Sequence, residues 1–138
     1  MSVGETVAAV LATGAGIAAI VIDRASDDAA GEAPILAGLA GAVTIGFAVL
    51  LFAWALPRAK LLKSEGTANA ALATSVIGCF SVASAWTGLP FVLGTGGAML
   101  GTVVRRGTEE PRQREIAAFA VGIGVLAVAL GCAAIGVL

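Results

Sequence analysis

The sequence predicts an all-α protein that crosses a membrane with five helices, and two observations support this fold class. Hydrophobic residues make up 59% of the 138 residues and the mean hydropathy is +1.01, which is more apolar than a water-soluble chain of this length can bury. Every charged residue lies outside five long apolar runs, and all of them except Glu5 lie in the gaps between these runs. Because an isolated charge in hydrocarbon costs at least about 2.5 kcal/mol, charge-free runs are typical of helices that face lipid. We expect a single transmembrane domain over residues 1–138.

The apolar runs give the boundaries of the expected helices. They cover residues 6–22, 34–56, 67–86, 89–104 and 116–138. The fourth run is the shortest, because at about 1.5 Å per residue it reaches only about 24 Å across a hydrocarbon core of roughly 30 Å. Arg105 and Arg106 follow it, and their long side chains can reach back to the interface, so a crossing is workable. Two alternatives stay open: four spans in all, or three spans plus a re-entrant hairpin.

The basic residues predict the orientation of the chain. Seven of the eight lie in two gaps between apolar runs: Arg58, Lys60, Lys63, Arg105, Arg106, Arg112 and Arg114. Short loops rich in Lys and Arg stay on the cytoplasmic side, so we expect these side chains to act as cytoplasmic anchors. The first gap is acidic and belongs outside. The N-terminus is then cytoplasmic and the C-terminus external, in the plasma (inner) membrane of a bacterium.

The composition excludes several kinds of chemistry. The chain has no His and no Tyr, which removes a His-held haem, zinc or copper, a Ser-His-Asp triad and a His proton relay. No expected span holds an ionisable acid or base, whereas ion-coupled transporters usually carry one near the bilayer centre. Glu5 is the sole candidate, and we interpret it as a solvated carboxylate at a helix N-terminus. We expect no enzyme activity, catalytic residue, metal site or cofactor. The net charge of −1 also gives no basic excess for binding nucleic acid.

Small residues recur in the apolar runs at the four-residue spacing that lets helices approach closely. The fourth run holds a GxxxG motif, and the other runs hold similar pairs; the candidates for helix packing are Gly97 and Gly101, Gly38 and Ala42, Ala12 and Gly16, and Ala127 and Gly131. Helices in lipid associate mainly through van der Waals contact at such positions, because lipid leaves no hydrophobic drive between them. We expect most of these pairs to join helices within the chain. The alternative is a homo-oligomer interface, with the GxxxG motif as its first candidate.

The third run is the most polar of the five. Thr74 and Ser81 share a helical stripe with Gly78, and Ser84 lies beside this stripe. Ser and Thr hydroxyls in membrane helices commonly bond to backbone carbonyls of their own or a neighbouring helix, and we expect this role here. The alternative is a weakly polar lining for a pore or a substrate path.

The stretch of residues 69–137 resembles a known kind of membrane hairpin. Its residues run from Asn69-Ala70-Ala71-Leu72-Ala73 through Trp86-Thr87-Gly88-Leu89-Pro90 to Arg105-Arg106-Gly107, then Arg112, Arg114 and a last apolar run. This order is similar to the Gly/Ala-rich membrane hairpin of an uncharacterised domain family common in actinobacterial proteins. In that family a hairpin is followed by a basic loop and another span. The resemblance implies this fold for half of the chain and implies no activity.

These observations favour a small, non-enzymatic membrane protein that acts by helix packing. It would serve as an accessory subunit of a membrane complex or form a homo-oligomer, and its expected partners are the lipid bilayer and other membrane helices. The alternative from a different class is a small channel or facilitator with a path lined by Ser, Thr and Gly. A membrane enzyme is a remote third.

Overall fold

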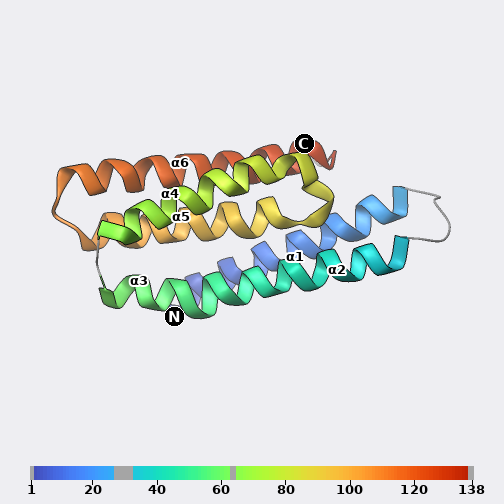
Figure 1. Ribbon diagram of the computed structural model, residues 1–138, viewed down its shortest axis with the longest axis horizontal. Coiled ribbons are helices and arrows are strands. Elements are labelled where there is room, and N and C mark those ends of the chain that lie inside the picture. Colours follow the sequence, from blue (N-terminus) through green and yellow to red (C-terminus); the bar gives the residue numbers. More distant parts are fainter. Residues whose placement is uncertain (1, 27–32, 63–64, 137–138) are drawn as a thin grey trace.

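The computed structural model describes residues 2–26, 33–62 and 65–136, and every element within these ranges is helical, with no strand. The helices are α1 (Val3–Ser26), α2 (Ala33–Ala48), η1 (Val49–Ala55), α3 (Leu56–Leu62), α4 (Glu65–Phe80), η2 (Ser81–Thr87), α5 (Leu89–Gly107) and α6 (Pro111–Ala134). α2, η1 and α3 form one continuous rod (Figure 1). The expectation of an all-α chain is therefore confirmed.

Four segments are long and apolar enough to cross a membrane. By length and composition they are Val3–Ile22, Gly38–Leu61, Gly66–Ser84 and Pro111–Ala134, among the residues that the structure describes. They correspond to the first, second, third and fifth of the expected spans. α5, which corresponds to the fourth, does not reach this apolarity because its last turn contains Arg105 and Arg106.

α5 lies at the centre of the bundle. It contacts all the other α-helices and runs between α6 and the pair formed by α1 and α2 (Figure 1). α4 and α6 contact both α5 and each other. Ten residues of α5 are buried, from Pro90 to Val104. A helix surrounded by other helices needs less apolar surface than one that faces lipid, so this position explains the Gly-rich sequence of α5.

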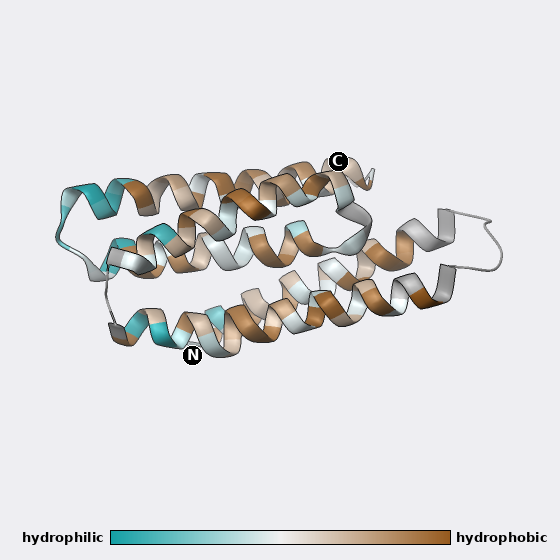
Figure 2. Cartoon of the chain, viewed as in Figure 1, coloured by the Kyte–Doolittle hydropathy of each residue, from teal (hydrophilic) through white to brown (hydrophobic). Residues whose placement is uncertain are grey.

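The two ends of the bundle differ in polarity. One end holds the N-terminus, α3, the start of α4 and the connection between α5 and α6, and hydrophilic residues gather there (Figures 1 and 2). The other end holds the turn between η2 and α5 and the C-terminus (Figure 1). The basic residues of α3 and those around the α5–α6 connection thus share one end, which we call the basic end.

Most helices extend beyond the predicted limits, and the second and the last of the expected spans do so by five residues or more at one end. The second span was expected to end at residue 56, but the rod continues through Pro57 to Leu62, so Arg58 and Lys60 lie in a helix. Pro57 has no N–H to donate, and the turn before it is wider, with the Leu56 N–H bonded to the Leu51 carbonyl five residues back. The last helix begins at Pro111 instead of residue 116. Proline suits a first helical turn, where its N–H would lack a partner anyway.

The turn before α5 connects α5 to α1 and α2 at the end opposite the basic residues. Gly88 has a φ of 73°, a left-handed conformation that glycine adopts without steric cost. A Cβ at Gly88 would lie 2.7 Å from the Cα of Gly16 in α1. The hydroxyl of Thr44 in α2 donates to the carbonyl of Thr87 at 2.5 Å. This turn therefore contacts α1 and α2 directly.

Candidate functional site

The residues expected to join helices fall into two groups, those turned into the bundle and those turned out of it. The inward group is densest where α5 meets α4 and α6. A Cβ at Gly97 would overlap the Ser75 side chain of α4 and lie 2.8 Å from the Ser75 backbone nitrogen. A Cβ at Gly101 would lie 2.8 Å from the carbonyl oxygen of Ala117 in α6. Both glycines are buried.

The two glycines of the GxxxG motif thus contact different helices of the same chain. Gly97 allows α4 to approach α5, and Gly101 allows α6 to approach α5. Gly94 extends the second contact, since a Cβ there would lie 2.7 Å from the carbonyl oxygen of Gly124. The motif is occupied by intramolecular contacts, so it offers no surface to a second copy.

Two other pairs from the sequence also lie inside the bundle. Ala12 is buried in the main apolar cluster, and a Cβ at Gly16 would lie 3.0 Å from the Gly88 carbonyl. Ala127 is fully buried, and a Cβ at Gly131 would meet the Phe91 ring at 3.2 Å. These four residues join α1 and α6 to their neighbours.

The pair in α2, Gly38 and Ala42, faces out of the bundle. Gly38 is exposed, and a Cβ built on it would meet no atom within 4 Å. Ala42 is exposed too, and Gly46, one further four-residue step along, also has open space beside it. The inward face of the same helix carries Ala40, Thr44 and Ala48. α2 therefore has two stripes of small residues, of which the chain uses one.

The hydroxyls considered as a polar lining all bond within their own helix. The Thr74 hydroxyl donates to the Ala70 carbonyl at 2.8 Å, and the Ser81 hydroxyl donates to the Ile77 carbonyl at 2.7 Å. The Ser84 hydroxyl donates to the Ser81 carbonyl at 3.1 Å, where η2 breaks regular helical geometry. Each donor is thus occupied by a local carbonyl.

Two hydroxyls that the sequence did not single out link different helices. Ser75 is fully buried, and its hydroxyl donates to the Ala120 carbonyl of α6 at 2.7 Å. Thr44 is fully buried as well and bonds to the turn before α5, as described above. A sequence signal existed for Ser75, because it shares a stripe with the small residues Ala68, Ala71 and Gly78.

We expect Ser75→Ala to destabilise the bundle more than Thr74→Ala, although the two residues are neighbours. The first variant removes a bond between helices, which in membrane proteins averages about 0.6 kcal/mol and reaches about 1.7 kcal/mol. The second removes a bond that the isolated helix makes by itself, so its free energy of unfolding should change less. Unfolding in mixed detergent micelles, followed by far-UV circular dichroism, measures both. A larger loss in Thr74→Ala would contradict the assignment of Ser75 as the interhelical donor.

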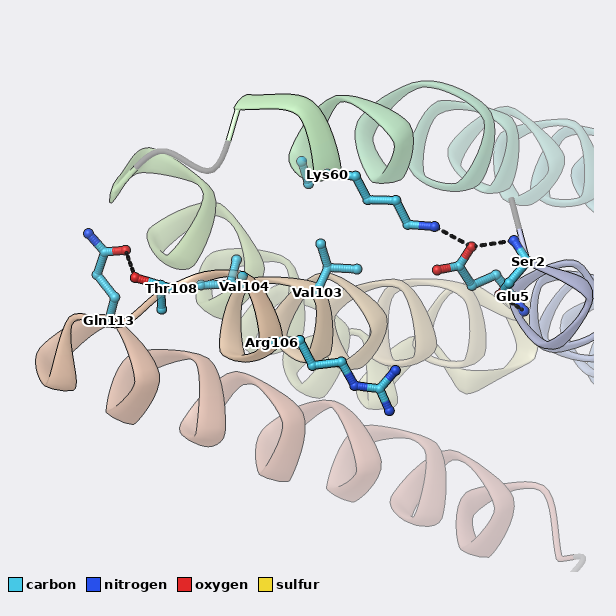
Figure 3. A pocket seen from close by; sticks show the side chains of 10 residues that line it. Ser2, Glu5, Lys60, Val103, Val104, Arg106, Thr108 and Gln113 are labelled. Carbon is cyan, nitrogen blue, oxygen red and sulfur yellow. Dashed lines mark hydrogen bonds and ion pairs between the residues drawn. The ribbon is translucent and has the colours of Figure 1, made fainter.

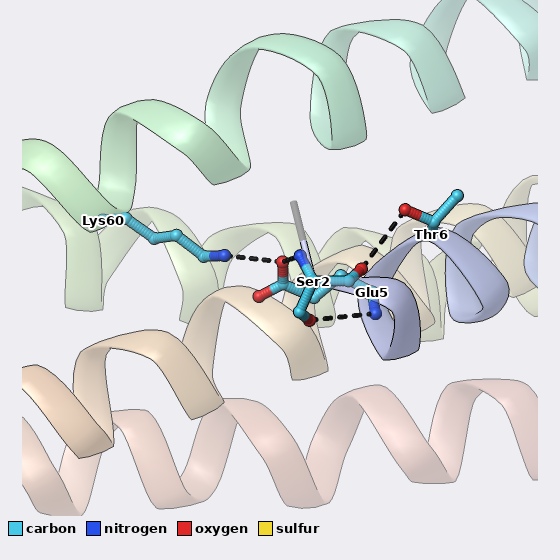
Figure 4. A network of polar contacts seen from close by, with 4 residues as sticks. All are labelled: Ser2, Glu5, Thr6 and Lys60. Carbon is cyan, nitrogen blue, oxygen red and sulfur yellow. Dashed lines mark hydrogen bonds and ion pairs between the residues drawn. The ribbon is translucent and has the colours of Figure 1, made fainter.

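A cavity of about 370 Å³ opens at the basic end, between α1, α3 and α5 (Figure 3). Within it the Lys60 ammonium pairs with the Glu5 carboxylate at 2.5 Å. Glu5 also accepts a hydrogen bond from the Ser2 N–H at 2.8 Å, while the Ser2 hydroxyl accepts one from the Glu5 N–H at 3.4 Å (Figure 4). This reciprocal pattern is a capping box, which the order Ser2-Val3-Gly4-Glu5 could have indicated.

Glu5 lies at the N-terminus of α1, as expected, and it also has a partner on another helix. Its side chain is 19% exposed, and it joins the start of α1 to α3 through Lys60. The two residues are separated by 55 positions, so no local spacing predicts the pair. The pair connects α1 to the rod formed by α2, η1 and α3 at the basic end.

The other expected anchors lie around this end. Arg58 stacks over the Trp54 ring, with its guanidinium carbon 4.4 Å from the ring centroid. Arg105 and Arg106 are exposed on the last turn of α5, and Arg112 and Arg114 are exposed near the start of α6. Lys63 lies outside the described residues.

The described residues bring no metal ligands together. No three Cys, Asp or Glu side chains lie close enough to hold an ion in the part of the chain that the structure covers. Cys79 and Cys132 are free thiols.

Comparison with known proteins adds no relative. No protein-family model, no curated protein and no solved structure matches this chain. The likeness of residues 69–137 to the actinobacterial membrane hairpin therefore stays a prediction. What the structure establishes for this stretch is the helical order: α4 and α5, then a basic connection, then α6.

Proposed function

We propose that this chain is a small, non-enzymatic protein of the bacterial plasma membrane that acts by helix packing. Four of its segments are long and apolar enough to cross a bilayer, and we propose α5, enclosed by them, as the fifth crossing. The basic end would lie on the cytoplasmic side, as expected for short segments rich in Lys and Arg. The N-terminus would then be cytoplasmic and the C-terminus external.

The outward stripe of α2 is the observation that supports this proposal. Gly38, Ala42 and Gly46 follow one another at four-residue steps and are exposed, and a Cβ at either glycine would meet no atom within 4 Å among the described residues. Large side chains stand beside them, with Ile35 80% exposed and Leu39 64% exposed. A row of small residues bordered by large ones forms a shallow groove in which a second helix can approach the backbone closely.

The partner helix would belong either to a second copy or to another subunit of a membrane complex. A second copy fits because identical stripes can face each other across a two-fold axis, which makes the interface self-complementary. A different subunit fits if it presents a complementary helix. The two cases differ in the mass and composition of the native particle.

We expect the double variant Gly38→Leu with Ala42→Leu to fold normally but to lose this association. Both residues are exposed, and a Cβ at Gly38 would meet no described atom within 4 Å, so the bundle should form, while the added bulk would hold a partner helix away. Association should weaken at least about tenfold, equivalent to about 1.4 kcal/mol. Native mass spectrometry of protein extracted in mild detergent measures the particle and identifies any other chain in it.

The control for this experiment is Gly122→Leu in α6. Gly122 is exposed and also meets nothing within 4 Å, but it lies on a different helix. It should keep the wild-type mass. If the wild-type protein is a monomer without other chains, or if the α2 variant keeps the same particle, the outer face of α2 faces lipid and the proposal is wrong.

The channel alternative receives less support than helix packing. A polar path needs hydroxyls that can face water, and Thr74, Ser81 and Ser84 already donate to carbonyls of their own helical segment. Gly78 in the same segment also leaves no room for a path, because a Cβ there would lie 2.8 Å from the Gly94 nitrogen. We therefore propose the packing function alone.

A further inference from the structure

Three arginines line one cleft at the basic end of the bundle. Arg105 and Arg106 come from the last turn of α5, and Arg114 comes from α6. The cleft has a volume of about 610 Å³. Thr102 and Thr108 also line its wall, but their hydroxyls already donate to the Ala98 carbonyl at 2.8 Å and to the Gln113 amide oxygen at 3.0 Å. Glu109 is the only carboxylate of the cleft among the described residues. Its wall therefore carries a net charge of +2.

None of these three guanidiniums is neutralised by the described part of the chain. The only ion pair there joins Lys60 to Glu5, and Arg106, which lies near that pair, does not take part in it (Figure 3). Acidic residues are available close by in sequence, but the Glu110 carboxylate instead accepts a hydrogen bond from the Gln113 amide at 2.8 Å. The positive charge of the cleft is thus free for a ligand.

Membrane orientation and helix polarity explain only part of this arrangement. Basic residues are favoured at the C-terminal end of a helix and on the cytoplasmic side of a membrane. The orientation preference would be met by arginines placed anywhere at this end, as Arg112 is in the first turn of α6, outside the cleft. The helix-end preference applies to Arg105 and Arg106 but not to Arg114, which lies near the start of α6. Neither requires three arginines to line a single cleft. The net positive charge of the cleft favours a ligand that is negatively charged.

The floor of the cleft indicates what else the ligand carries. Val121 lies seven residues beyond Arg114 along α6, which at about 1.5 Å per residue places it roughly 10 Å closer to the middle of the bundle. Thr102 precedes Arg106 by about one turn of α5, toward the middle of the bundle. The cleft thus leads from a charged rim toward the apolar part of the helices. A ligand that fits it is anionic at one end and apolar at the other.

We propose that this cleft binds the headgroup of an anionic phospholipid, with its phosphate held by Arg105, Arg106 and Arg114. The planar guanidinium presents paired N–H donors that match two phosphate oxygens at once. Basic hollows between membrane helices bind anionic headgroups for the same reason. The site rests on the proposed membrane crossing but does not depend on which helix packs against α2, so loss of the α2 association alone would leave it standing.

The test is lipid retention by the full-length protein. Protein in detergent is mixed with phosphatidylglycerol or with phosphatidylcholine, and native mass spectrometry counts the lipids that stay bound. We expect phosphatidylglycerol to bind more tightly. Arg105→Gln with Arg114→Gln should weaken its binding by about fivefold for each arginine removed, since one basic residue near a membrane surface contributes about 1 kcal/mol.

Two further variants separate a built site from general charge. Arg112→Gln removes the same charge from the same segment but outside the cleft, so it should leave lipid binding nearly unchanged. Glu109→Gln removes the carboxylate of the cleft and should strengthen binding, a result that a misfolded variant would not give. An equal loss in Arg112→Gln would show that surface charge alone attracts the lipid, and a loss in Glu109→Gln would show that no anion is bound beside this carboxylate. Either result would overturn the proposal.

The remaining arms concern the identity of the ligand. Inorganic phosphate is added alone to the same protein and should bind much more weakly than the lipid, because it has no apolar part for the floor of the cleft. If phosphatidylcholine were retained as well as phosphatidylglycerol, the arginines would not select an anionic headgroup. If inorganic phosphate bound as tightly as phosphatidylglycerol, the ligand would be the free anion. Either result would refute the lipid assignment.

Discussion

Replacing Gly97 or Gly101 by Ile is expected to prevent the α4, α5 and α6 bundle from forming. At Gly97 the new Cβ would overlap the Ser75 side chain and approach its backbone nitrogen, and at Gly101 it would press on the Ala117 carbonyl. Backbone atoms cannot move aside as the end of a flexible side chain can. Each variant should lose at least about 3 kcal/mol of the free energy of unfolding, the upper part of the usual range for overfilled cores.

Thermal unfolding in detergent, followed by far-UV circular dichroism, measures this loss. Gly122→Ile is the matched control, because it makes the same substitution in a helix at a site with open space beside it. Its free energy of unfolding should stay within about 0.5 kcal/mol of wild type. Thr95→Val, two residues before Gly97 in α5, removes a hydroxyl without placing a side chain between two backbones. It should cost far less stability than either glycine variant. Wild-type stability in both inner glycine variants would mean that α5 does not pack closely against α4 and α6.

The expected fold class depended on hydropathy, and hydropathy is a property of whole segments. It was sufficient to predict an all-α chain and to locate the four segments that can cross a membrane. α5 is the expected span that is not apolar enough to be identified in this way. Its glycines and the Arg105–Arg106 pair make it less apolar, yet it is the most enclosed helix, because close contact with protein replaces contact with lipid.

The direction in which each helix faces was harder to predict. A membrane helix is apolar on all sides, so hydrophobic periodicity does not distinguish its inner face from its outer one. α2 offers two equivalent stripes, one through Ala40 and one through Gly38, and only the position of α1 and α5 decides which is buried. In α4 we considered Thr74 as part of a polar lining, whereas its neighbour Ser75 is the residue that faces inward.

Boundaries and long-range pairs were missed for a different reason. Pro57 and Arg58 look like the end of a helix, but a wider turn accommodates the missing N–H and the rod continues to Leu62. The Glu5–Lys60 pair joins two helices whose contact depends on the whole fold. The capping box of Ser2 and Glu5, by contrast, was within reach of a sequence pattern.

Gly88→Ala is expected to be the most damaging single-methyl change at the end of the bundle opposite the basic residues. Two effects add at this position. Its φ of 73° is unfavourable for alanine by roughly 1–2 kcal/mol, and the new methyl group would collide with the backbone of Gly16 in α1. Because Thr44 bonds to the adjacent Thr87 carbonyl, the turn cannot move away without also disturbing α2.

Gly136→Ala separates the two effects, since Gly136 has nearly the same φ, 74°, but open space around it. It should show the conformational strain alone, a loss of roughly 1–2 kcal/mol at most at the end of the last helix. Gly88→Ala should exceed it by about 1–3 kcal/mol, the usual penalty of overfilling a close contact. Both are measured by unfolding in the same detergent. Equal losses in the two variants would mean that Gly88 is held only by its own turn, and that α1 does not pack against it.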